Sequence, residues 1–111
     1  MIPAEDWKWY GSPAHFVGRA DCTFHLATEV GEYLVSTVGD YWPTGGAVES
    51  QAQEIGSGRL YETMVFRFKD RCPCGCRMPL AEGNPLDAVG CNDSDTANKT
   101  HLNLCRKYAN A

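Results

Sequence analysis

Apolar and polar residues alternate in three segments of the chain, as strands of a half-buried sheet require. In "CTFHLATE", residues 22–29, one face carries Cys22, Phe24 and Leu26. The segments "EYLVSTV" (residues 32–38) and "LYETMVFRFK" (residues 60–69) alternate in the same way. The short interval at Val30-Gly31 predicts a hairpin between the first two strands. A further short strand is expected near residues 14–17.

A helix is predicted over residues 94–109, "SDTANKTHLNLCRKYA". Residues 92–95 provide side-chain oxygens that can cap its start, and Arg106 and Lys107 suit its last turn.

Two segments show neither the alternation of a strand nor the periodicity of a helix. Residues 41–58 are rich in glycine and polar side chains, which is typical of an exposed loop. Residues 70–93 carry Cys, Gly and Pro, and we expect them to need an external constraint to become ordered.

The composition is that of a folded chain, with 43% hydrophobic and 22% charged residues among 111. No apolar run is long enough to span a membrane. The first ten residues contain two acids and lack the apolar core of a signal peptide. We therefore expect the protein to be in a reducing cytoplasm. There the six cysteines are expected to be metal ligands or free thiols in preference to disulfides.

The densest group of cysteines lies in "CPCGC", residues 72–76, and His101 and Cys105 follow on the predicted helix. Residues four apart on a helix share a face, and zinc takes about four nitrogen or sulfur ligands. We expect a structural zinc ion with ligands drawn from Cys72, Cys74, Cys76, His101 and Cys105. Cys91 can replace one of the three clustered thiols.

Two alternatives to zinc stay open, namely disulfide bonding within the cluster and unmetallated thiols. In the second case Cys105 packs as a small apolar group and His101 is a surface histidine. Cys22 and His25 lie three apart on a strand and so face opposite sides. A site formed by His15 and His25 is a further alternative to structural histidines.

The fold class predicted from these segments is α+β: a small antiparallel β-sheet followed by a cysteine-rich zinc-binding loop and one C-terminal helix. One domain is expected over residues 1–111, with the sheet in 1–69 and the zinc knuckle and helix in 70–111. The length suits one domain, because domains cluster at about 100–150 residues.

Sequence motifs of common enzyme classes are missing. The chain has no H-E-x-x-H, no H-x-E with P-C-x-x-C, no G-x-S-x-G and no Walker lysine. Four protein ligands on zinc would also leave no position for a substrate. We therefore predict a non-enzymatic protein, and an enzyme using His15, Cys22 or His25 ranks last.

Charge is unevenly distributed along the chain. The net charge is -4, and residues 1–65 hold nine acids against three bases. Tryptophans and tyrosines lie in the same part, where they can form a binding platform or close the core. The predicted partner-binding residues are Trp7, Trp9, Glu29, Glu32, Asp40, Tyr41 and Trp42. A basic stripe follows in the second part, at Arg67, Lys69, Arg71 and Arg77.

The segments "DWKWYG", "CTFHLATEVGEYLVSTVGDYWP", "GSGRLYETMVF", "CPCGC" and "THLNLCRKYA" resemble a family of small proteins encoded by tailed phages and prophages. The likeness runs over nearly the whole chain and is weakest in residues 44–54. It implies a phage product made in the cytoplasm of a bacterial host, with no activity or catalytic residues attached.

Three functions follow as hypotheses. The first is a phage accessory protein that binds a host protein with a basic surface, such as a component of a defence system. The second is a zinc-stabilised nucleic-acid-binding module that uses the basic stripe. The third is an accessory protein of the virion head or tail.

Overall fold

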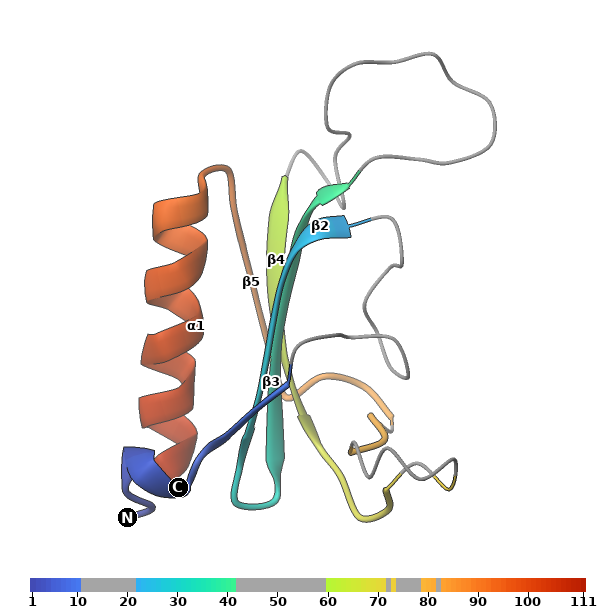
Figure 1. Cartoon of the computed structure of the whole chain (residues 1–111), viewed down its shortest axis with the longest axis vertical. Helices are drawn as coiled ribbons and strands as arrows, with labels where there is room; N and C mark the ends of the chain where they lie inside the picture. The colour runs from blue at the N-terminus through green and yellow to red at the C-terminus, as the bar shows by residue number, and fades with distance from the viewer. Residues whose placement is uncertain (11–21, 42–59, 72, 74–78, 82) are drawn as a thin grey trace.

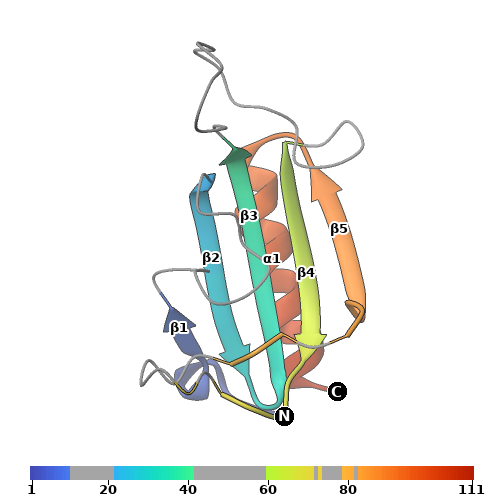
Figure 2. The same cartoon turned by 90° about the vertical axis from the view of Figure 1, so that its right-hand side faces the viewer.

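The computed structural model describes residues 1–10, 22–41, 60–71, 73, 79–81 and 83–111, and only the backbone of residues 22–25 and 40–41. Strands pair antiparallel in one sheet of order β1-β2-β3-β4-β5, and α1 covers one face of it (Figures 1 and 2). The elements are a 3-10 helix η1 (Ala4–Asp6), β1 (Lys8–Tyr10), β2 (Cys22–Val30), β3 (Tyr33–Tyr41), β4 (Tyr61–Arg67), β5 (Asp87–Cys91) and α1 (Ser94–Ala109). The predicted α+β sheet and C-terminal helix are therefore confirmed.

The strands predicted from alternation are confirmed as β2, β3 and β4. A tight turn joins the first two, with Val30 paired to Tyr33. Gly31 in this turn has a φ of 60°, which glycine adopts without a steric penalty. A Cβ there would also lie 2.6 Å from Cδ1 of Ile2, so the end of that side chain would have to shift. The strand expected near residues 14–17 lies outside the described residues.

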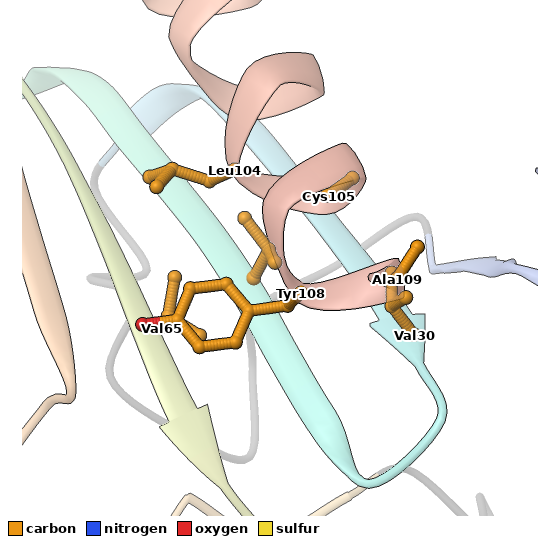
Figure 3. Close-up of a cluster of buried hydrophobic side chains, with 7 residues drawn as sticks. Val30, Val65, Leu104, Cys105, Tyr108 and Ala109 are labelled. Carbon is orange, nitrogen blue, oxygen red and sulfur yellow. The ribbon is translucent and has the colours of Figure 1, made fainter. Parts of the chain in front are cut away.

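One face of the sheet packs against α1 and forms the main core (Figure 3). Val35 of β3 is paired with Val65 of β4, so the two side chains meet on this face. Each buried aliphatic side chain of this size contributes about 1.5–3 kcal/mol. The buried members of the cluster are Val30, Val35, Val65, Leu104, Cys105, Tyr108 and Ala109.

The opposite face of the sheet carries a second cluster, formed by Ala27, Leu34 and Phe68. Beyond β4 the chain turns onto this face, where Phe68 and Ala81 lie in the same cluster (Figure 1). Arg71 and Pro79 form an isolated antiparallel bridge, and the amide of Leu80 donates to the carbonyl of Asp70 at 3.0 Å. The two ends of the segment 72–78, which contains Cys72, Cys74 and Cys76 and is called the cysteine segment below, are thus held together.

The edge strand β5 is an element that the sequence pattern misses, since residues 70–93 show no period. Ala88 and Val89 are exposed, so apolar and polar positions do not alternate there. Pairing to β4 fixes the strand instead. Its first residue, Asp87, accepts hydrogen bonds from Lys107 (2.7 Å) and from the Tyr108 hydroxyl (3.1 Å). Tertiary contacts, which no local pattern records, therefore form this strand.

The helix α1 is confirmed at its predicted bounds. Asp93 caps it: its carboxylate accepts from the amide of Thr96 at 3.1 Å and from the Thr96 hydroxyl at 2.8 Å. Arg106 and Lys107 lie in its last turn. Opposite charges at the two ends complement the helix dipole.

Replacing Gly39 by alanine is expected to destabilise the sheet. Gly39 is paired with Tyr61 across β3 and β4, and an added Cβ would overlap the ring of Tyr61. Overpacking of this kind costs about 1–3 kcal/mol. Urea unfolding should show a lower free energy of unfolding for Gly39→Ala. The same change in a Tyr61→Leu background should cost less, and an equal cost in both would contradict the steric origin.

Candidate partner-binding site

Trp9 is a large apolar side chain that the fold leaves half exposed, at 51%. It lies in β1 and is paired with Thr28 of β2, on the side of the sheet that α1 covers. Its ring centroid is 5.6 Å from that of His101, and the two rings are tilted by 33°. One side of the indole therefore rests on α1 while the other meets solvent.

His101, beneath Trp9, is fully buried and uses both ring nitrogens. Nε2 lies 2.8 Å from the hydroxyl of Thr28, and Nδ1 lies 2.7 Å from that of Thr37. The Thr37 hydroxyl also lies 2.7 Å from the hydroxyl of Thr63. The network joins α1 to β2, β3 and β4, and it fixes the position of the ring that supports Trp9.

Burial keeps this network uncharged. It lowers the pKa of His101 to about 4, so the ring is neutral at neutral pH. A neutral imidazole has one donor and one acceptor nitrogen, hence one threonine hydroxyl accepts from the ring and the other donates to it. Burial likewise raises the pKa of Cys105 to about 11, against a smaller opposing effect from Thr28. The Cys105 thiol therefore stays protonated.

Trp7 has a different role from Trp9. It is half-buried, packs against the main core, and its indole nitrogen donates to the carbonyl of Ile2 at 3.3 Å. A hollow of about 290 Å³ opens beside it, between the start of the chain and the end of α1. The hollow is lined by Met1, Ile2, Ala4, Trp7, Arg106, Ala109 and Asn110. Trp7 thus anchors the segment that carries Trp9.

Two exposed acids lie close to Trp9 in the chain, namely Glu5 and Asp6 of η1. Ile2 contacts Gly31, which places η1 at the same end of the sheet as Glu32 (Figure 2). We call Glu5, Asp6 and Trp9 the Trp9 surface; Glu32, which was predicted to belong to it, is paired with Arg67 at 3.3 Å. The sequence analysis missed Glu5 and Asp6, although two acids directly before a Trp-Lys-Trp segment were a visible signal.

Glu29, predicted to face a partner, is instead buried at 7% exposure on the opposite face of the sheet. The guanidinium of Arg71 donates two hydrogen bonds to its carboxylate, at 2.8 and 2.6 Å, and the Tyr10 hydroxyl donates a third at 2.6 Å. Burial alone would raise the pKa of Glu29, but the hydrogen bonds from Arg71 and Tyr10 outweigh it and lower the pKa. Glu29 therefore serves the fold and presents no charge to a partner.

The basic stripe of the nucleic-acid hypothesis is largely engaged within the protein. Arg71 binds Glu29, and Arg67 lies 3.3 Å from Glu32 and donates to the Tyr33 hydroxyl at 3.0 Å. Lys69 is exposed, and Arg77 lies outside the described residues. Because two of the three described cations are paired with acids, the geometry gives this hypothesis little support.

The structure describes three of the residues predicted as zinc ligands or their alternative, namely His101, Cys105 and Cys91. His101 and Cys105 are buried between α1 and the sheet, whereas Arg71 and Pro79, at the ends of the cysteine segment, lie on the other face. Cys91 is paired with Tyr61 at the far end of β4. Among the described residues, no three His, Cys, Asp or Glu side chains gather closely enough to hold a metal ion.

Several predicted residues cannot be placed. The ones outside the described residues are His15, Trp42, Cys72, Cys74, Cys76 and Arg77. Only backbone positions in β2 or β3 are described for Cys22, His25, Asp40 and Tyr41. Within the described part of the chain, no helix has both the length and the apolar character needed to cross a membrane.

Comparison with known proteins found no matching family model, no similar curated protein and no similar solved structure. The site is therefore interpreted from its own geometry.

The pKa of His101 predicts that stability falls in mild acid. Unfolding returns the pKa to about 6.5, so below that pH the unfolded chain binds the extra proton and the folded chain does not. The contribution of the neutral His101 ring to the free energy of unfolding is complete above pH 6.5 and is lost as the pH falls towards 4. Between pH 7 and 5 the free energy of unfolding should drop by about 2 kcal/mol from this residue alone. Urea unfolding across that range checks the drop.

The matched control is His101→Gln, which keeps a donor and an acceptor but does not titrate. Its overall stability should be lower, and its slope between pH 7 and 5 should be much flatter. Equal slopes for the two proteins would show that His101 is not the buried neutral group.

Proposed function

We propose that this protein is a non-enzymatic binding protein that captures a protein partner with a basic surface through the Trp9 surface. The observation that carries the proposal is the half-exposed indole of Trp9, supported from below by His101. Its neighbours Glu5 and Asp6 supply the negative charge that selects a basic partner.

A tryptophan of this kind suits binding for an energetic reason. Tryptophan is enriched among the few residues that carry most of an interface's binding energy. Ordering a mobile side chain on binding costs about 0.5–1.5 kcal/mol. Contact with the buried His101 ring restricts Trp9 before any partner arrives, which reduces that cost.

Charge supports the same type of partner. The chain has a net charge of -4, and the acids of η1 are exposed. Opposite charge raises the rate of encounter and disfavours acidic competitors. A host protein that itself binds nucleic acid would offer such a basic surface.

The resemblance to proteins of tailed phages supports the setting of this proposal. It suggests a bacterial cytoplasm during infection and a host protein as the partner, with a defence component as one candidate. Affinity capture of the tagged protein from infected cells, followed by purification of the captured protein, supplies the reagent for the test.

Trp9→Ala is expected to weaken binding of the purified partner at least tenfold, because it removes the anchor of the surface. A double variant, Glu5→Lys with Asp6→Lys, should also weaken binding, most strongly at low salt where charge is least screened. Isothermal titration measures both. Leu86→Ala is the matched control, since Leu86 is 52% exposed but lies beside β5 at the other edge of the sheet. Equal affinity of Trp9→Ala and the parent protein would contradict the proposal.

A structural zinc ion in the cysteine segment is a separate part of the proposal. The spacing of Cys72, Cys74 and Cys76 supports it. His101 does not fit the ligand set, because both of its nitrogens already bond threonine hydroxyls. We therefore assign the zinc to the thiols of the segment together with a fourth protein ligand other than His101, as a closed structural site requires.

The purified protein is expected to carry about one zinc ion per chain, measured by native mass spectrometry and elemental analysis. Replacing Cys74 and Cys76 by serine should remove the metal, because thiolates are its ligands. His101→Gln should retain it. Loss of zinc in His101→Gln would restore histidine to the ligand set, and a folded parent protein without zinc would exclude the site.

A further inference from the structure

The outer edge of β5 is the feature that the candidate site does not use. The strand lies at one end of the sheet order, and β1 with the Trp9 surface lies at the other (Figure 2). None of the strands that the structure describes pairs with this edge. A strand edge carries a row of backbone donors and acceptors that another strand can use.

Apolar side chains are exposed in and directly before this strand. Leu86 is 52% exposed and Val89 is 37% exposed, and Ala88 is exposed between them. Natural edge strands are commonly guarded by lysine, proline or a bulge. The sequence of β5, DAVGC, has neither lysine nor proline, and the carboxylate of Asp87 is held by Lys107. The opposite edge, β1, is only three residues long and includes the exposed Lys8.

We propose that β5 pairs antiparallel with β5 of a second copy of this chain, about a twofold axis at Val89. In this register Val89 meets Val89 of the other copy, and Ala88 lies opposite Gly90. Asp87 lies opposite Cys91, so no two like charges face each other across the seam. The strand is therefore complementary to itself, which an interface between identical copies requires.

The charges of α1 favour the same arrangement. The helix begins where β5 ends, so its acidic start lies at one end of the strand and its basic last turn at the other. Antiparallel pairing of the strands brings Asp93, which follows the end of β5, beside the partner's end that carries Lys107, the basic residue of α1 that faces β5 through Asp87. The dipoles of the two helices are then also opposed.

Sedimentation velocity of the full chain over a wide range of concentration tests the pairing. The parent protein is expected to show a monomer–dimer equilibrium. Val89→Lys should raise the dissociation constant at least about tenfold, because it places two lysines directly opposite each other across the seam. Ala88→Lys should raise it less, because its two lysines are diagonal neighbours, each opposite Gly90 of the other copy.

Asn98→Lys is the matched control. Asn98 precedes Lys107 by nine residues, which at about 100° per residue places it on the opposite side of α1. Lys107 faces β5 through Asp87, so a lysine at position 98 adds the same charge away from the seam. This variant should dimerise like the parent, and circular dichroism should show that all three variants are folded.

A cross-link locates the axis even if a lysine variant fails to fold. Residues directly opposite in an antiparallel pair have Cβ atoms about 4.5–5.5 Å apart. Val89→Cys in a Cys91→Ser background should therefore form a disulfide between copies at position 89, identified by mass spectrometry of the linked peptide.

Three results would overturn the pairing: a parent protein that is monomeric at every concentration, a dimer that neither lysine variant weakens, or a cross-link that does not form. Binding of an extended segment of another protein at this edge, by a monomer, would also overturn it. The Trp9 surface lies at the other edge, so failure here leaves the proposed function to its own test.

Discussion

The hydrogen bonding of His101 to threonines of two strands determines where α1 lies on the sheet. Apolar contacts between a helix and a sheet are not directional, and several positions of α1 would bury Leu104 and Tyr108 equally well. A buried imidazole allows only positions in which both nitrogens find partners, because an unsatisfied buried polar group costs about 1–3 kcal/mol. Thr28 and Thr37 meet that requirement from adjacent strands.

This arrangement gives each face of the sheet its own polar centre. The helix side has the neutral network of His101, and the other side has the ion pair between Glu29 and Arg71. Removing Arg71 would leave the buried carboxylate of Glu29 without its cation, so Glu29 depends on Arg71. Polar residues that appeared available for binding, such as Glu29, therefore hold the protein together.

The sequence predicts the elements whose own side chains define them. Alternation in β2, β3 and β4 reflects one buried position in two, and the Asp93 cap and basic end of α1 are local signals. It could not predict β5, because pairing with β4 and contacts of Asp87 with α1 create that strand. Long-range partners of this kind leave no trace in a local pattern.

The candidate site was predicted in part, for the same reason. Trp9 was identified by type, and the structure shows that it is exposed. Glu29 was assigned to the partner surface because it lies in the acidic part of the chain, and its partner Arg71 is distant in sequence. His101 was assigned to zinc from its spacing to Cys105, whereas its partners are threonines of β2 and β3.

The bridge between Arg71 and Pro79 has a separate consequence. Because the bridge fixes the positions of residues 71 and 79, a change in the number of residues between them should cost little stability, since the entropy of closing a loop grows slowly with its length.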